Sequence, residues 1–185
     1  MKKLIILDRD GVINQDSPDY IKSVDEWIPI PGSLDAIAAL NKADYTVVIA
    51  TNQSGIGRGL YTLETLEKIH QKMRDALSQV NGHLDGIFFC PHEPTDHCLC
   101  RKPLPGLFHQ IFNHFKVAAP FNNIMSIGDS LRDLEAAQNA GCTPILVLTG
   151  NGEKTKQKLP TTLLNIPIYS NLAAAVSALL ARESK

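Results

Sequence analysis

Residues 3–12 read KLIILDRDGV, a short aliphatic run that ends at once in two aspartates and a glycine. The apolar run at residues 3–7, bounded by charge, is typical of a buried strand in a parallel sheet. Similar runs recur along the chain, at residues 46–50, 86–89, 124–127 and 144–148. Stretches with helical period lie between or after them, at residues 33–42, 63–80, 106–115, 131–140 and 171–181. This alternation predicts a doubly wound, Rossmann-like α/β fold with one parallel sheet covered on both faces.

Capping residues support the boundaries of the expected helices. Ser33, Thr62 and Asn171 stand where N-cap residues are expected, and Gly141 stands where a helix-terminating glycine is expected. In a sheet of this kind, ligands bind outside the carboxyl ends of the strands. Functional residues are therefore to be sought directly after the strands.

Length and charge bound the class of protein. The chain has 185 residues and a formal net charge of −1, so we expect a single domain over residues 1–185. Balanced charge argues against nucleic acid as a partner. No apolar run is long enough for a membrane span, and the N-terminal residues lack the pattern of a signal peptide. We therefore expect a cytoplasmic protein with no membrane partner.

Acidic residues follow two of the expected strands. Asp8 and Asp10 close the first, Asp129 follows the fourth, and Asp133 lies one helical turn further on. Asp8 and Asp10 alone are as typical of a polar turn as of a site. If the two strands are neighbours, however, three carboxylates converge, and such a group suits Mg²⁺. Without a cation they would repel one another, which would raise at least one pKa.

Two further segments offer groups that bind phosphate. Residues 51–55, Thr-Asn-Gln-Ser-Gly, follow the second strand and supply a hydroxyl and backbone N–H groups. Arg101 and Lys102 precede the third helix and bring cations to the same rim. By themselves, residues 51–55 are as typical of a polar turn as of a site, and a basic dipeptide is usually just solvated surface. The nearby Gly55-x-Gly57-x-Gly59 lacks the spacing of a dinucleotide-binding loop.

Together these segments resemble the four ordered motifs of the haloacid dehalogenase superfamily, and they span residues 8–133. The matching residues are Asp8-x-Asp10-Gly-Val, Thr51-Asn52, Lys102 and Gly128-Asp129-x-x-x-Asp133. The resemblance implies a Mg²⁺-dependent phosphatase that forms an aspartyl phosphate on Asp8, with Asp10 as general acid and base. It also implies roles for the other matching residues: Thr51 and Lys102 hold the phosphoryl group, Asp8, Asp129 and the Asp10 carbonyl bind Mg²⁺, and Asp133 orients this group.

Three of the four cysteines lie close together beside a histidine, as Cys90-Pro-His92 and Cys98-Leu-Cys100. Three thiolates and one imidazole match a closed tetrahedral zinc site. Because such a site has no open position for water, we expect a structural Zn²⁺ that orders the loop carrying Lys102. The alternatives are coincidental surface thiols, or His97 as the fourth ligand, which its adjacency to Cys98 disfavours. Cys142 is expected to be a core thiol.

The zinc loop narrows the resemblance. Its Cys-x-His and Cys-x-Cys-Arg-Lys-Pro pattern, with residues 8–14 and 51–59, is similar to the superfamily branch of heptose-bisphosphate and histidinol-phosphate phosphatases. This implies release of the 7-phosphate from a heptose 1,7-bisphosphate, in the supply of heptose for lipopolysaccharide core. Histidinol-phosphate hydrolysis is the alternative, and an inactive zinc-stabilised binding module is a third. Ser130 departs from many relatives, which carry Lys or Arg there; Arg132 or Arg101 could replace that charge.

Short intervals between the motifs leave no room for a separate lid domain. We therefore expect a capless monomer that selects a small phosphorylated sugar through its loops, at residues 14–31, 53–58 and the zinc loop. The expected substrate-binding residues are Asn52, Gln53, Ser54, Arg58 and Arg101. The distal phosphate of a sugar bisphosphate is expected near Arg58 or Arg101.

Overall fold

A computed structural model describes residues 3–183. Its six strands form one sheet in the order β3-β2-β1-β4-β5-β6, and every neighbouring pair is parallel. The strands are β1 (Lys3–Leu7), β2 (Tyr45–Asn52), β3 (Gly86–Cys90), β4 (Met125–Gly128), β5 (Thr143–Val147) and β6 (Ile168–Tyr169). The doubly wound fold is thus confirmed, with its topological switch between β1 and β4.

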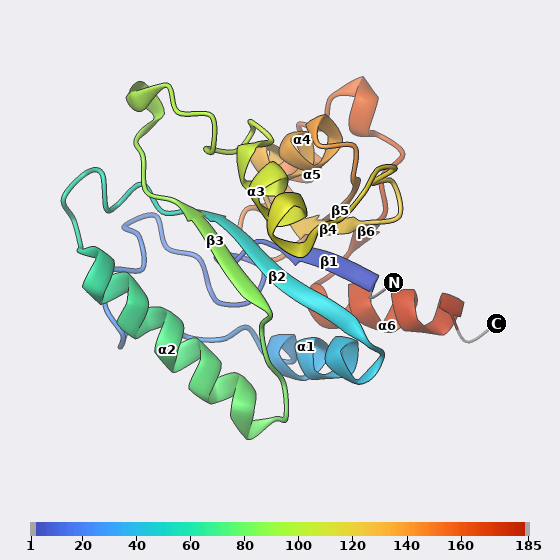
Figure 1. Ribbon diagram of the computed structural model, residues 1–185, viewed down its shortest axis with the longest axis horizontal. Helices are drawn as coiled ribbons and strands as arrows, with labels where there is room; N and C mark the ends of the chain where they lie inside the picture. Colours follow the sequence, from blue (N-terminus) through green and yellow to red (C-terminus); the bar gives the residue numbers. More distant parts are fainter. Residues whose placement is uncertain (1–2, 184–185) are drawn as a thin grey trace.

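Helices cover both faces of the sheet (Figure 1). They are α1 (Ser33–Lys42), α2 (Leu63–Gln79), α3 (Gly106–Phe115), α4 (Leu131–Asn139), α5 (Gly152–Lys156) and α6 (Leu172–Glu183). One core cluster joins α1, α2 and α6 to one face, and a second joins α3 and α4 to the other. Because both faces are covered, β1 and β2 are buried along nearly their whole length rather than at alternate residues.

The described chain differs from the sequence expectations in a few places. Ser33 is the first residue of α1 rather than its N-cap, because Gly32 takes that position with φ 80° and Ser33 Oγ instead donates to the Ile13 carbonyl at 2.6 Å. The two-residue strand β6 and the five-residue helix α5 were not expected, since neither is long enough to show a period. Thr62 and Asn171 do cap their helices.

No cap domain interrupts the described residues at the carboxyl edge of the sheet. The segment between β1 and α1 contains turns and two isolated bridges, and the segment between β3 and α3 contains only the short 3₁₀ helix η1 (Pro94–Asp96). Trp27, in the first of these segments, is buried in the core and packs under Lys72. Among residues 3–183, no helix combines the length and apolar character that crossing a bilayer requires.

The order of the strands decides where the chemistry lies. β1 pairs with β2 on one side and with β4 on the other. The residues that follow these three strands therefore meet at one edge, at the switch point. Asp8, Thr51 and Asp129 all reach that edge, although they are far apart in the sequence.

The Thr62 cap makes a testable contribution to stability. Its hydroxyl accepts a hydrogen bond from the Thr65 N–H at 3.1 Å, so Thr62→Ala is expected to lower the free energy of unfolding by about 1 kcal/mol. Urea denaturation measures this change. Thr62→Ser keeps the oxygen and should lose much less; equal losses in the two variants would contradict the capping role.

Candidate active site

Asp8 stands at the centre of the site, directly after β1. Its N–H donates to the Ile127 carbonyl of β4 at 2.9 Å, which continues the parallel ladder one residue beyond the strand. Its Oδ1 accepts a hydrogen bond from the Arg9 N–H at 2.8 Å. The pairing of β1 with β4 therefore determines where the Asp8 carboxylate lies.

Lys102 is buried against Asp8 and uses all three of its ammonium hydrogens. Its Nζ lies 3.0 Å from Asp8 Oδ1, 2.5 Å from Asp133 Oδ1 and 2.7 Å from the carbonyl oxygen of Ala50. Burial alone would lower the pKa of Lys102, but the Asp133 and Asp8 carboxylates outweigh it and raise that pKa. The lysine is therefore a fixed positive charge beside Asp8.

Asn52 holds the backbone of Lys102 in place. Its side-chain amide donates to the Lys102 carbonyl at 3.0 Å and accepts from the Lys102 N–H at 3.1 Å. This pair of bonds fastens the loop before α3 to the end of β2. The sequence suggested Asn52 as a substrate ligand; in the structure its side-chain amide binds the Lys102 backbone.

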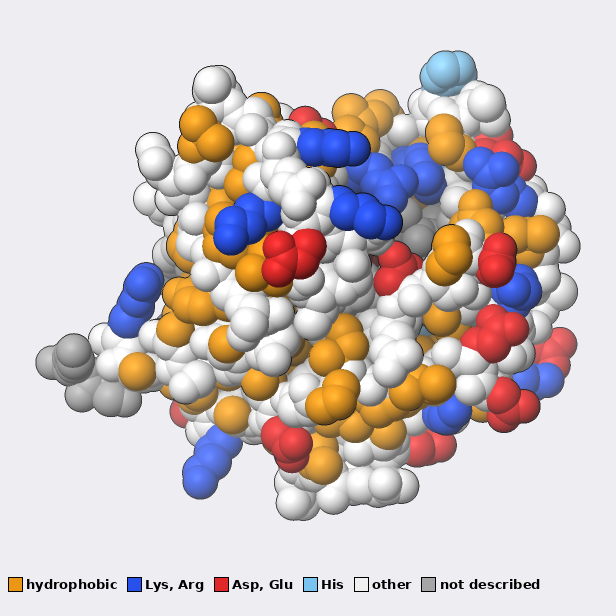
Figure 2. Space-filling view, turned by 180° about the vertical axis from the view of Figure 1, so that it is seen from behind, with side chains coloured by type: hydrophobic (Ala, Val, Ile, Leu, Met, Phe, Trp, Pro, Cys, Tyr) orange, Lys and Arg blue, Asp and Glu red, His pale blue; other side chains and the backbone are white. Residues whose placement is uncertain are grey.

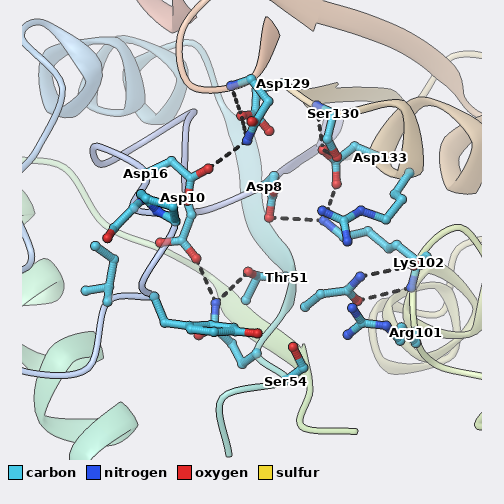
Figure 3. A pocket seen from close by; sticks show the side chains of 18 of the residues that line it. Asp8, Asp10, Asp16, Thr51, Ser54, Arg101, Lys102, Asp129, Ser130 and Asp133 are labelled. Carbon is cyan, nitrogen blue, oxygen red and sulfur yellow. Dashed lines mark hydrogen bonds and ion pairs between the residues drawn. The ribbon is translucent and has the colours of Figure 1, made fainter. Parts of the chain in front are cut away.

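Three buried carboxylates converge at the strand ends (Figure 3). Asp8, Asp129 and Asp133 each offer an oxygen within 4.8 Å of the others. Burial is the main cause that raises the pKa of Asp8 to about 7 and that of Asp129 to about 8, and the charge of Asp133 adds to it. A buried group of this kind with one lysine beside it fits a divalent cation bound through oxygen.

The carboxylates differ in how far the protein already satisfies them. Asp133 Oδ1 faces Lys102, while its Oδ2 accepts bonds from the Ser130 N–H at 3.0 Å and the Ser130 hydroxyl at 2.5 Å. Since Asp133 lies in the first turn of α4, the start of that helix sets its position. Asp133 thus braces the site, whereas Asp8 and Asp129 present oxygens to it.

Asp129 is held by the loop after β5. The Asn151 N–H donates to Asp129 Oδ2 at 2.7 Å, and the Asn151 side chain also reaches Asp16 at 2.7 Å. Gly11, with φ 78°, passes so close that a Cβ there would collide with the Asp129 carboxylate. Asn151 was not among the expected site residues, because one asparagine in a polar loop carries no pattern.

Asp10 lies at the same edge of the sheet but is not among the three converging carboxylates. Its carboxylate accepts bonds from Arg9 Nε at 3.0 Å, Arg9 Nη2 at 3.0 Å, Asn14 Nδ2 at 2.8 Å and Gln53 Nε2 at 2.9 Å. The Arg9 side chain is fully buried. Arg9 was not among the expected site residues, because the sequence does not show that its side chain turns inward.

A cavity of about 340 Å³ opens above these groups. Its floor includes Asp8, Asp129 and the Thr51 hydroxyl, which accepts a bond from Gln53 at 3.0 Å and keeps its own hydrogen for donation. Ser54 points into the same space (Figure 3). The face shown in Figure 2 has a hollow bordered by Lys and Arg side chains.

Arginines supply the positive rim of this cavity: Arg58, Arg101 and Arg132. Arg58 lies 3.7 Å from Glu93, and Arg101 donates to the His92 carbonyl at 3.1 Å. Burial lowers the pKa of Arg101, and the neighbouring charge of Arg132 lowers it further. Two guanidinium groups held so near each other favour an anionic ligand.

A second cluster, of sulfur and nitrogen atoms, lies beside the cavity. Cys90, His92, Cys98 and Cys100 bring their ligand atoms together, as the sequence spacing suggested, and His97 is not among them. The Sγ atom of Cys100 lies 3.2 Å from that of Cys90 and 3.6 Å from that of Cys98, and 3.3 Å from His92 Nδ1. These separations approach the edge of about 3.8 Å in a tetrahedral zinc–thiolate site.

Comparisons with known proteins agree with this geometry. A family model described as "HAD-hyrolase-like" matches residues 99–173. A protein of Bordetella bronchiseptica is 60% identical over 153 residues, which cover 83% of this chain and 84% of that protein. A protein of Pseudomonas aeruginosa is 52% identical over 180 residues and covers 97% and 98%. Both relatives are named D-glycero-beta-D-manno-heptose-1,7-bisphosphate 7-phosphatase.

A solved structure is similar over nearly the whole chain. It is the D,D-heptose 1,7-bisphosphate phosphatase of B. bronchiseptica, complexed with magnesium and phosphate, with a TM-score of 0.92, 54% identity, and coverage of 97% of this chain and 99% of that one. Fold and site thus define a hydrolase of the haloacid dehalogenase type. Within that class, the chain belongs to the D-glycero-beta-D-manno-heptose-1,7-bisphosphate 7-phosphatase family.

The raised carboxylate pKa values predict how pH and Mg²⁺ act on stability. The folded-state pKa values of Asp8 and Asp129 are about 7 and about 8, well above their ordinary value of 3.8. The metal-free fold should therefore lose stability as the pH rises from about 3.8 to about 8, because the unfolded chain releases these two protons first. Mg²⁺ binds the ionised form, so the increase in Tm on adding Mg²⁺ should be larger at about pH 8 than at about pH 6. Thermal denaturation at each pH in chelator-free buffer, with and without added Mg²⁺, measures both effects.

Asp129→Asn provides the control for this prediction. It removes one of the two carboxylates with a raised pKa, so both the loss of stability with pH and the Mg²⁺ effect should shrink. An increase in Tm that is the same at the two pH values in the unchanged chain would contradict the assignment.

Proposed function

We propose that this chain is a Mg²⁺-dependent phosphatase that removes the 7-phosphate of D-glycero-beta-D-manno-heptose 1,7-bisphosphate. The observation that carries the reaction class is the convergence of Asp8, Asp129 and Lys102 at the switch point of the sheet. The substrate rests on family membership, since the relatives at 60% and 52% identity carry that name.

Asp8 is the nucleophile in this proposal. A carboxylate oxygen attacks phosphorus while the bond from phosphorus to the sugar oxygen breaks, and the phosphoryl group passes to Asp8. Asp10 gives its proton to the departing sugar oxygen, which leaves as the alcohol. Asp10 belongs to the same edge of the sheet, two residues after Asp8, so one short turn places both groups.

Water completes the reaction from the same side chains. Asp10, now ionised, takes a proton from a water molecule that attacks the phosphorus of the aspartyl phosphate. The bond between Asp8 and phosphorus breaks, inorganic phosphate leaves, and both aspartates return to their starting state. Splitting hydrolysis into two displacements lowers a barrier that is among the highest known for uncatalysed biological reactions.

The remaining groups offset the negative charge of the phosphate. Mg²⁺ held by Asp8, Asp129 and the Asp10 carbonyl supplies positive charge when it is bound. Lys102 adds a charge that its three contacts keep in place, and the Thr51 hydroxyl donates from the floor of the cavity. Asp133 keeps Lys102 oriented.

In this proposal, the arginine rim and Ser54 bind the rest of the sugar bisphosphate. With the reacting phosphate at Asp8, the distal phosphate lies toward Arg101 or Arg58 at the opening. Ser130 turns its hydroxyl to Asp133 and adds no charge there. Arg132, which lines the same cavity, supplies positive charge two residues further on.

We further propose that Cys90, His92, Cys98 and Cys100 bind a structural Zn²⁺. Four ligands fill a tetrahedral shell and leave no position for substrate or water. The loop that they would close runs from the end of β3 to Lys102, so the metal acts by holding this lysine. The donor set and its spacing support this proposal.

Family membership favours the heptose substrate over histidinol phosphate and over an inactive binding module. We place the reaction in the supply of activated heptose for lipopolysaccharide core. The sugar leaves the reaction with its other phosphate intact.

Asp8→Asn tests the proposed reaction. We expect the unchanged chain to release phosphate from the heptose bisphosphate when Mg²⁺ is present, and Asp8→Asn to lower kcat by more than about a thousandfold. The variant should fold, because asparagine has nearly the shape of aspartate. Asp75→Asn, on the exposed face of α2, is the matched control and should retain activity. Comparable activity in Asp8→Asn would refute the nucleophile.

Metal analysis tests the zinc proposal. Protein purified without chelator should contain about one zinc per chain, and Cys100→Ser should lose it and melt roughly 5 °C or more below the unchanged chain. Cys142→Ser is the control, because Cys142 is a buried thiol that does not belong to the group of four ligands. Zinc retained at full content by Cys100→Ser would overturn the ligand assignment.

A further inference from the structure

Behind Asp10 lies a buried polar chain for which the proposed reaction gives no explanation. Arg9 binds the Asp10 carboxylate through Nε and Nη2, both at 3.0 Å, and its Nη2 also donates to Gln53 Oε1 at 3.1 Å. Tyr61 donates its hydroxyl to the same Gln53 oxygen at 2.6 Å. All three side chains are buried. This series of hydrogen bonds therefore runs from Tyr61, at the start of α2, to Asp10.

The orientation of the Gln53 amide follows from its neighbours. Arginine has donors only, so the amide atom that faces Arg9 must be the oxygen. The amide nitrogen then faces Asp10 Oδ2 at 2.9 Å and Thr51 Oγ1 at 3.0 Å. Both ends of the amide are thus engaged by protein groups. Gln53, suggested by the sequence as a substrate ligand, thus donates to Asp10 and Thr51 in this structure.

Tyr61 is held where it can donate to Gln53. Gly55 makes room for it, because a Cβ at that position would collide with the tyrosine ring. Tyr61 directly precedes Thr62, the N-cap of α2, so the helix start also places the ring. Burial raises the pKa of Tyr61 to about 12, and its hydroxyl therefore keeps its proton.

His70 contacts Arg9 at the end of this series of hydrogen bonds. Its Nε2 lies 3.4 Å from Arg9 Nη1. Burial and the charge of Arg9 lower the pKa of His70 to about 3, so the imidazole is neutral and accepts a hydrogen bond. The positive charge of Arg9 is consequently directed at Asp10, the carboxylate it binds through two nitrogens.

We propose that Tyr61, acting through Gln53 and together with Arg9, is a positioning residue that orients the Asp10 carboxylate for proton transfer. This inference rests on the proposed function. A carboxylate that donates and accepts a proton must present one oxygen to the leaving group, and rotation of Asp10 away from it would slow that transfer. Tyr61 donates to Gln53 and is not among the residues that line the cavity, so its effect passes through Gln53 to Asp10.

A comparison of two substrates with different leaving groups distinguishes this role from a merely structural one. The heptose alcohol needs a proton as it departs, whereas nitrophenolate leaves as a stable anion and does not. kcat/KM reports the steps up to transfer of the phosphoryl group to Asp8, so it isolates proton donation to the leaving group. Loss of the correct orientation of Asp10 should therefore lower kcat/KM for the sugar phosphate far more than for 4-nitrophenyl phosphate.

Tyr61→Phe removes only the hydroxyl and keeps the ring that Gly55 accommodates. We expect kcat/KM for the heptose bisphosphate to fall about tenfold, while kcat/KM for 4-nitrophenyl phosphate changes less than about twofold. Gln53→Met, which removes the amide but keeps the length, should show the same selective loss. Thermal denaturation of each variant establishes that it is folded at the assay temperature.

Tyr45→Phe is the matched control, since it also removes a tyrosine hydroxyl that donates at 2.6 Å, here to Glu183 at the other end of the sheet. Tyr45→Phe should leave kcat/KM unchanged for both the heptose bisphosphate and 4-nitrophenyl phosphate. Equal losses on the two esters, or none on either, in folded Tyr61→Phe and Gln53→Met would overturn this inference and leave the proposed function standing. An unchanged chain that hydrolyses neither ester would overturn the proposed function and this inference with it.

Discussion

The site depends on one buried ion cluster, in which the Lys102 ammonium lies 3.0 Å from Asp8 and 2.5 Å from Asp133. Removing these charges from water costs several kcal/mol per ion, so the arrangement is stable only while every partner stays in place. Three separate features provide for this: the amide of Asn52 holds the Lys102 backbone, the first turn of α4 places Asp133, and the β1–β4 pairing places Asp8. The lysine thus links the loop after β3 to the centre of the sheet.

The two clusters that could hold a metal ion differ in how they face the cavity. The carboxylates of Asp8 and Asp129 line the cavity and keep oxygens directed into it. The cysteine and histidine side chains face one another and close a loop on its flank. A filled shell suits a structural ion, and an open oxygen site suits an ion that meets substrate. The sequence carries both clusters within residues 8–133, but only the sheet brings the loop beside the strand ends.

Much of the fold and of the reacting groups could be predicted from local pattern. α1 and β1 match the expected ranges, because an amphipathic period and a buried apolar run are properties of a short segment. Ser33 was the exception, since Gly32 with φ 80° already begins the helix and the serine hydroxyl found a carbonyl instead. α5 and β6 were too short to carry a period. The strand-end aspartates and the clustered cysteines were visible because their chemistry is distinctive at close spacing.

The buried strands and the reactive side chains that follow them could be predicted from the order of residues, because both depend on neighbours along the chain. The polar groups that the protein uses for its own hydrogen bonds became apparent only in the folded arrangement. Asn52 and Gln53 read as equivalent candidates for substrate, yet their amides are engaged with Lys102, and with Asp10 and Thr51. Arg9 likewise turned inward to Asp10 and Gln53. Hydrogen bonds of this kind join residues from different strands and loops, and the packing that aligns them is not encoded in any single segment.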